Sequence, residues 1–126
     1  MIVVDTSALM AILLGEGDGE RCIATLANEA QVLISAGTLA EAMVVSDRRN
    51  VGGELRRLVD DLAFEVIPIS AAGAARVAEA YARWGRGVHR AALNFGDCFA
   101  YALAREQDVR LLFVGEDFAL TDVIAA

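Results

Sequence analysis

Four carboxylates that are far apart along the chain occupy positions where a fold could bring them together: Asp5, Glu41, Asp97 and Asp117. Asp5 directly follows the apolar residues 2–4, and Asp117 follows the mostly apolar residues 111–115. In an open parallel sheet, ligands bind outside the carboxyl ends of the strands, so acids delivered there can share one pocket. Several carboxylates without fixed partners form the hard-oxygen site that Mg²⁺ or Mn²⁺ prefers. The pattern therefore indicates metal-dependent phosphate chemistry.

The first two acids also have simpler structural explanations. Asp5 could cap the helix that follows it, although Thr6 or Ser7 could do that without it. An unpaired carboxylate at the end of a buried strand would otherwise be costly, which favours a functional role. Glu41 is expected in the first turn of a helix, where the helix dipole favours an acid. Neither residue is a strong signal by itself.

The last two acids are similarly open to a second interpretation. Asp97 could belong to a plain helix start at residues 94–97, but its apolar neighbours make an idle surface acid less natural there. Asp117 could be a solvated loop acid, and Glu116 or Asp122 could replace or assist it as a ligand. The argument for a site rests on four acids sharing one expected edge of one sheet.

The expected elements alternate between strand and helix. Strands are expected at residues 1–4, 31–35, 64–67 and 110–114, with an edge strand at 123–124. Helices are expected at residues 6–14, 20–28, 37–47, 54–62, 70–84 and 94–106. Residues 85–93 are the most loop-like stretch, and residues 115–121 are expected to form a loop or a short helical turn. This order predicts an α/β fold with a mostly parallel sheet of four to five strands.

Composition limits the class of protein. With 126 residues, of which 56% are hydrophobic, the chain is expected to form one ordered domain spanning residues 1–126. No apolar run approaches the roughly 18 residues of a membrane span, and the N-terminus lacks the basic region of a signal peptide. A cytoplasmic location is therefore expected. Cys22 and Cys98 do not form a zinc motif or a disulfide framework, so both are predicted to be buried free thiols.

The charge distribution bears on possible ligands. The formal net charge is −7, and an acidic protein repels phosphate unless its acids are concentrated and neutralised by a metal ion. All eleven basic residues are arginine. Arginine suits phosphate and carboxylate recognition, although a GC-rich coding sequence would produce the same bias.

Several segments resemble motifs of one known family, the PIN-domain nucleases. Residues 4–9 (VDTSAL) resemble the opening of these proteins, and residues 93–102 (LNFGDCFAYA) resemble their third acidic motif as found in VapC-type toxins. Residues 111–118, followed by Thr121 and Asp122, resemble the fourth motif, and Glu41 falls where the second acid of the family stands. The resemblance covers nearly the whole chain in order. It implies a PIN-like three-layer α/β/α fold.

The resemblance also implies roles for individual residues. The family's acidic quartet carries over to Asp5, Glu41, Asp97 and Asp117. The hydroxyl after the first acid carries over to Thr6 or Ser7, and Asn94 belongs to the same motif as the third acid. The sequence departs from the family pattern at two positions, and both changes make the edge of the expected site more negative. Many relatives have lysine where Val114 stands and asparagine where Glu116 stands.

The function implied is that of a metal-dependent endoribonuclease, the toxin of a toxin–antitoxin pair. Crowded carboxylates would bind Mg²⁺, or Mn²⁺, which lowers the pKa of a water that then attacks phosphorus. Asp5 and Asp97 are expected to be the principal ligands, while Glu41 and Asp117 hold a second metal or orient water. One or two metals would satisfy this arrangement. The products would carry a 5′-phosphate and a 3′-hydroxyl.

The expected partners follow from the same resemblance. Arg86, His89 and Arg90 lie in the loop beside the expected site, where they could contact RNA phosphates or partner carboxylates. The family further implies a homodimer and a cognate antitoxin with a basic tail, for which a net charge of −7 is suitable. The apolar residues Leu9 and Ile23 belong either to such an interface or to the core.

Two alternatives belong to other functional classes. The first is a non-catalytic PIN-like module whose acidic pocket only holds a basic partner segment. The second is a phospho-acceptor receiver domain, which also places acids at strand ends. That fold would need an acceptor aspartate after the third strand and a late lysine, whereas this chain has Pro68 there and contains no lysine.

Overall fold

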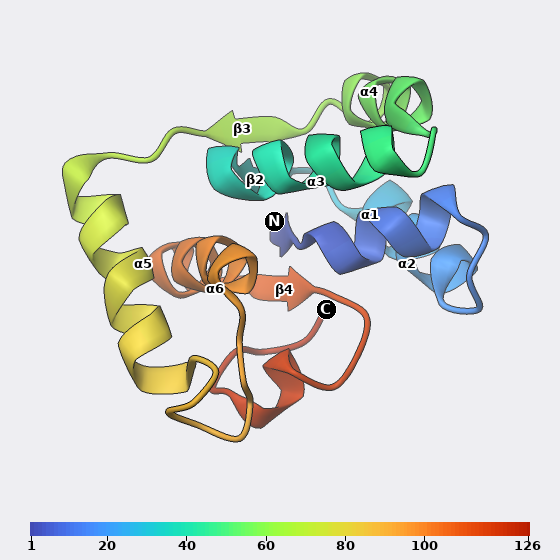
Figure 1. Ribbon diagram of the computed structural model, residues 1–126. Helices are drawn as coiled ribbons and strands as arrows, with labels where there is room; N and C mark the ends of the chain where they lie inside the picture. The colour runs from blue at the N-terminus through green and yellow to red at the C-terminus, as the bar shows by residue number, and fades with distance from the viewer.

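A parallel sheet of four short strands forms the centre of the molecule (Figure 1). The computed structural model describes all residues, 1–126. The strands lie in the order β3-β2-β1-β4, and their bounds are Ile2–Val4 (β1), Val32–Ser35 (β2), Glu65–Ile67 (β3) and Arg110–Leu112 (β4). Every pairing is parallel, so all four carboxyl ends meet at one edge.

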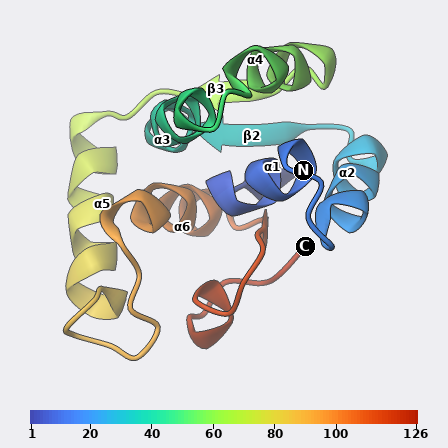
Figure 2. The ribbon, with the colours of Figure 1, turned by 45° about the vertical axis from the view of Figure 1, so that its right-hand side comes forward.

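Helices fill the connections between the strands. They are Thr6–Leu13 (α1), Gly19–Asn28 (α2), Ala36–Arg48 (α3), Gly52–Asp61 (α4), Ala71–Trp84 (α5), Phe95–Gln107 (α6) and the 3₁₀ turn Phe118–Leu120 (η1). None of the helices combines the length and the apolar character that crossing a bilayer requires. In two views, α3 lies above and α6 lies below the start of α1 (Figures 1 and 2).

The two faces of the sheet carry separate cores because side chains alternate along each strand. Val3, Leu33 and Leu111 form a row across three strands and pack with α5 and α6. Val4 and Leu112 point to the other face and pack with α1 to α4. This arrangement of helices on both faces confirms the predicted three-layer α/β/α fold.

The predicted edge strand at residues 123–124 is wrong. Leu111 donates a backbone hydrogen bond to Ile124 at 2.8 Å and accepts one from Ala126 at 2.9 Å, which makes a single parallel bridge between Leu111 and Ala125. The chain reaches β4 only at Ile124 because Asp122 is still bound to side chains of α5 and α6. The other boundaries agree with the prediction to within about two residues; the largest differences are at the end of β4, which is Leu112 rather than residue 114, and at the start of α4, which is Gly52 rather than residue 54.

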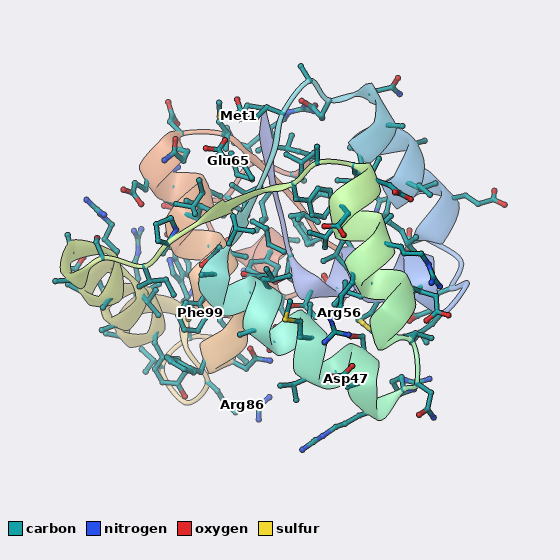
Figure 3. The ribbon with its side chains drawn as sticks, turned by 90° about the horizontal axis from the view of Figure 1, so that it is seen from above. Met1, Asp47, Arg56, Glu65, Arg86 and Phe99 are labelled. Atoms are coloured by element: carbon teal, nitrogen blue, oxygen red, sulfur yellow. The ribbon has the colours of Figure 1, made fainter.

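Helices α3 and α6 meet at a glycine. A Cβ atom on Gly37 would lie 2.4 Å from Cδ1 of Phe99, so only hydrogen fits between the first turn of α3 and this ring. Figure 3 shows Phe99 beside the start of α3. Because these two helices carry Glu41 and Asp97, their close approach sets the separation of the two carboxylates.

Replacing Gly37 with alanine is therefore expected to destabilise the protein by about 1–3 kcal/mol, the usual cost of overpacking a core contact. Urea denaturation followed by circular dichroism measures the change. Gly53→Ala is the matched control, because nothing lies within 4 Å of the added Cβ in α4, and it should leave stability unchanged or slightly raised. Equal stability of Gly37→Ala and the native protein would contradict the close packing.

Candidate active site

Asp5 lies buried at the junction between β1 and α1, with only 2% of its surface exposed. It is the N-cap of α1, which confirms the alternative that Asp5 caps the helix; the expectation that Thr6 or Ser7 caps it is wrong. The Oδ2 atom accepts hydrogen bonds from the backbone N–H of Ser7 at 3.0 Å and from the Ser7 hydroxyl at 2.7 Å. The Ser7 hydroxyl also accepts from the backbone N–H of Val114 at 3.0 Å, which ties the segment after β4 to Asp5.

The second oxygen of Asp5 has no partner. Its Oδ1 atom is buried and forms no hydrogen bond, a property that it shares only with the Thr38 hydroxyl oxygen. The pKa of Asp5 is raised from 3.8 to about 7, chiefly by burial and to a smaller extent by the charges of Asp97 and Glu41, against the lowering effect of the Ser7 hydrogen bonds. A buried carboxylate oxygen without a donor is the kind of group that binds a cation.

Glu41 approaches Asp5 from α3. Its Oε1 atom accepts a hydrogen bond of 2.7 Å from the Thr6 hydroxyl, which places the residue after Asp5 in direct contact with the second acid. The predicted position of Glu41 in the first turn of its helix is wrong, because α3 begins earlier, at Ala36, with Ser35 as its N-cap. Helix-dipole stabilisation is therefore no longer an explanation for an acid at this position.

The first turn of α6 leaves room for the Glu41 carboxylate. A Cβ atom on Gly96 would lie 1.9 Å from Oε2 of Glu41, so the carboxylate rests directly on the glycine backbone. Gly96 was not among the residues predicted to belong to the site. The sequence did offer one indication, because a glycine in the first turn of an expected helix is a poorer helix former than alanine.

Asp97 is also on α6, where it forms a capping box with Asn94. The backbone N–H of Asp97 donates to Asn94 Oδ1 at 2.8 Å, and the backbone N–H of Asn94 donates to Asp97 Oδ2 at 2.9 Å. The pKa of Asp97 is raised, chiefly by burial and also by the charges of Glu41 and Asp117, while the Asn94 hydrogen bond and Arg86 lower it. Asp5, Glu41 and Asp97 therefore lie close enough for their charges to act on one another.

Asp117 is exposed and lies at the edge of this group. It precedes η1 without capping it by a side-chain hydrogen bond, and its charge acts on Asp97. Glu116 is equally exposed. Asp122 does not join the acids, because it accepts a 2.6 Å hydrogen bond from the Tyr101 hydroxyl and lies 3.5 Å from Arg83 and 3.8 Å from Arg105.

Asp122 instead anchors the segment that carries Asp117. The buried Trp84 indole N–H donates to the Tyr101 hydroxyl at 2.8 Å, and this hydroxyl donates to Asp122. Tyr101 is one helical turn after Asp97. Helix α6 therefore carries Asp97 itself and, through Tyr101 and Asp122, restrains the segment that carries Asp117. Phe118, buried after Asp117, adds an apolar anchor in the core formed by α5 and α6.

The loop at residues 85–93 is more ordered than a solvated flexible loop would be. Arg86 bonds through its backbone N–H to Leu93, and its side chain projects outward beyond α6 (Figure 3). His89 stacks edge-on against Trp84 at 4.8 Å, and its Nδ1 accepts from the Ala91 N–H, so this ring shapes the loop. Arg90 is exposed. Among the three residues predicted to contact substrate, Arg86 is the one whose charge lowers the pKa of Asp97.

The residues present fit a divalent cation. The site offers an unpartnered buried oxygen on Asp5 and two further carboxylates whose charges repel it. The missing hydrogen-bond partner and the charge repulsion both cost free energy, and a bound cation would reduce both costs. The side chains as placed do not gather three ligands closely enough to enclose an ion. Metal binding would therefore draw the carboxylates inward.

The sequence is similar to those of known proteins over nearly its whole length. The model of the family described as PIN domain matches residues 2–124. A ribonuclease VapC from Mycolicibacterium smegmatis is 41% identical over 98% of this chain and 98% of that protein. Ribonuclease VapC30 from Mycobacterium tuberculosis is 40% identical over 97% of this chain and 95% of that protein.

Solved structures share the fold. VapC20 from Mycobacterium tuberculosis, described as a sarcin-ricin loop cleaving toxin, has a TM-score of 0.80 at 17% identity, covering 100% of this chain and 98% of that one. A toxin–antitoxin complex from Klebsiella pneumoniae has a TM-score of 0.75 at 22% identity, covering 100% and 97%.

The raised pKa of Asp5 predicts how stability depends on pH. The folded state keeps the proton up to about pH 7, whereas the unfolded chain releases it near 3.8. The folded state therefore binds more protons in this window, so the free energy of unfolding falls as pH rises through it, by at most roughly 4 kcal/mol. Urea titrations at several pH values should show this slope, and Asp5→Asn, which preserves the cap, should remove most of it. An unchanged slope in the variant would contradict the assignment.

The hydrogen-bonded chain through Tyr101 gives a second prediction. Tyr101→Phe removes the hydroxyl between Trp84 and Asp122 and leaves the buried indole N–H without an acceptor, which should cost about 1–3 kcal/mol of stability. Thermal and urea unfolding measure the loss. Tyr81→Phe removes the hydroxyl of an exposed tyrosine on α5 and should be neutral. Equal effects of the two variants would exclude the anchoring role.

Proposed function

Because this chain belongs to the PIN domain family and, within it, to the VapC ribonucleases, we propose that it is a metal-dependent endoribonuclease and the toxin of a toxin–antitoxin pair. The observation that carries the proposal is the unpartnered, buried Oδ1 of Asp5, facing the charges of Glu41 and Asp97. Burial and the like charges of Glu41 and Asp97 both disfavour the ionised form of Asp5, and a bound cation would offset both effects.

Asp5, Glu41 and Asp97 would hold Mg²⁺ or Mn²⁺, and Asp117 would reach it from the exposed rim. The bound ion supplies positive charge and an activated water for attack on a phosphodiester. Ser7 holds Asp5 through Oδ2, which leaves the buried Oδ1 without a partner. The Thr6 hydroxyl holds one oxygen of Glu41 and leaves the other over Gly96. Asn94 holds Asp97 Oδ2 and leaves the other oxygen available.

Arg86 is the residue that we assign to the RNA backbone. It is exposed, and its charge acts on Asp97 from outside the acidic group. A phosphate placed between the guanidinium and the cation would be attracted from both sides, which offsets the repulsion expected from the net charge of −7. Arg90, farther along the same loop, would add a weaker and less specific contact.

The partners proposed for this chain are a cognate antitoxin and a second copy of the toxin. Several of the structural neighbours are toxin–antitoxin complexes, among them VapBC2 from Rickettsia felis and FitAB. A basic antitoxin tail would be attracted by the acidic site and could place a cationic side chain where the metal binds. Competition between added Mg²⁺ and a basic peptide of the antitoxin would be visible as a loss of peptide binding when Mg²⁺ is added at constant ionic strength.

The test of the proposed function is cleavage of RNA with Mg²⁺ or Mn²⁺. Asp5→Asn should reduce the rate by roughly a hundredfold or more, since the charge stabilisation that a bound cation supplies is several kcal/mol. Glu41→Gln and Asp97→Asn should have similar effects, whereas Asp117→Asn should have a smaller one because the residue is exposed.

Asp108→Asn is the matched control for these variants. Asp108 is exposed at the left-handed C-cap of α6, with φ of 53°, a conformation that asparagine tolerates well. It should cleave RNA at the native rate. Cleavage that persists in Asp5→Asn and in the presence of a chelator would refute the metal-dependent mechanism. A native protein that binds a basic peptide but cuts no RNA would favour the non-catalytic binding module.

A further inference from the structure

Two buried side-chain atoms in this protein lack a hydrogen-bond partner, Oδ1 of Asp5 and the hydroxyl oxygen of Thr38. Thr38 is completely buried in the first turn of α3. Buried polar groups in proteins are paired in the great majority of cases, so an unpaired one requires an explanation. The roles proposed above for the acids and their supporting hydroxyls make no use of this group.

A hydroxyl within a helix is usually satisfied by the carbonyl group one turn before it. Ser46, which is also completely buried on α3, follows this rule and donates to the carbonyl of Met43 at 3.2 Å. Thr38 does not, because it stands so early in the helix that the carbonyl groups three and four residues before it belong to β2. Its hydroxyl therefore has no partner within its own helix.

The register of the sheet places Thr38 close to Asp5. Strands β1 and β2 are parallel neighbours in which Val3 pairs with Leu33. Asp5 and Ser35 stand two residues later on each chain segment, so they leave the sheet side by side. Ser35 is the N-cap of α3, and Thr38 follows it within the first turn of that helix.

A hydroxyl of the site contacts Thr38 directly. The side chain of Thr6, the residue after Asp5, donates to Oε1 of Glu41 at 2.7 Å and lies 3.4 Å from the carbonyl oxygen of Thr38. Thr38 and Glu41 are three residues apart on α3, so their side chains lie on the same face of the helix. The unpaired hydroxyl thus belongs to the face of α3 that brings Glu41 to the site.

The two unpaired groups are chemically complementary. The Thr38 hydroxyl has a proton to donate, whereas an oxygen of the ionised Asp5 carboxylate only accepts and has two lone pairs. One lone pair of Oδ1 can accept from the hydroxyl while the other faces a cation. The side chains as placed do not make this bond. Movement of Glu41 toward Asp5 on cation binding would carry Thr38, on the same helix face, in the same direction.

We propose that the Thr38 hydroxyl donates a hydrogen bond to Oδ1 of Asp5 when a divalent cation is bound, which makes Thr38 a positioning residue. The inference rests on the proposed function and adds a residue to its site. Ser7 already holds Oδ2 of Asp5, so the bond from Thr38 fixes the orientation of the whole carboxylate. Outer partners of this kind typically change metal affinity or activity about tenfold to a hundredfold when they are removed.

Thr38→Val, which keeps the shape of the side chain and removes its hydroxyl, tests the inference by thermal unfolding with and without Mn²⁺. Without the ion, Tm should rise by a few degrees, because an unpaired buried hydroxyl has been removed. The Mn²⁺ concentration that gives half of the thermal stabilisation should increase about tenfold or more. At a fixed, sub-saturating Mn²⁺ concentration, kcat for RNA should fall by a similar factor while KM for RNA stays unchanged, because Thr38 is buried.

Two further comparisons isolate the hydroxyl. Thr38→Ser and Thr38→Ala differ from each other only in that group, so serine should keep the native Mn²⁺ requirement and alanine should not, whatever the packing of valine. Ser46→Ala is the matched control, since it removes a buried hydroxyl of α3 that is already paired. It should lower Tm and leave the Mn²⁺ requirement and kcat unchanged.

Failure of the proposed function can be separated from failure of this inference. If the native protein cuts no RNA but its Mn²⁺ requirement depends on the Thr38 hydroxyl, the nuclease is refuted and the positioning role stands. If the native protein cuts RNA and Thr38→Val binds Mn²⁺ as the native protein does, the positioning role alone is refuted. A native protein whose Tm responds to neither Mn²⁺ nor Mg²⁺ overturns both.

Discussion

The arrangement of the site depends on the burial of one carboxylate, Asp5, at the end of the central strand β1. One of its oxygens caps α1 and is bound by Ser7, while the other has no partner. The residues that begin α1 therefore also hold the Asp5 carboxylate in a buried position, where its ionised form is unfavourable without a counter-charge. Ser7 extends this constraint to Val114, so the segment after β4 is fixed by the residues that fix Asp5.

The fold could be predicted because its signals are local. Apolar runs separated by helix starts were sufficient to place the elements, and the order of strands and helices led to the parallel sheet that β1, β2, β3 and β4 form. The shared edge of Asp5, Glu41 and Asp97 followed from this topology. The final strand was mispredicted since its pairing depends on Asp122, a long-range contact that leaves no local pattern.

Other features of the site could not be predicted because they depend on packing between helices. Whether Asp5 or a hydroxyl neighbour caps α1 is decided by the burial of the β1–α1 junction. The role of Gly96 follows from the position of Glu41 on α3, and that position depends in turn on Gly37 and Phe99. A sequence pattern shows that a glycine is present but not which side chain from another element occupies the space.

The chain has a negative net charge, and yet its proposed substrate, RNA, is a polyanion. The two are compatible because the charge near the bound phosphate matters more than the charge of the whole chain. Phosphate binding requires positive charge only where the phosphate lies, and the cation proposed to bind at the unpartnered Asp5 oxygen, together with the guanidinium of Arg86, would supply it there. Elsewhere, acidic surface repels nucleic acid that is not engaged at the site. Attraction of the phosphate is therefore confined to the acidic site and its immediate surroundings.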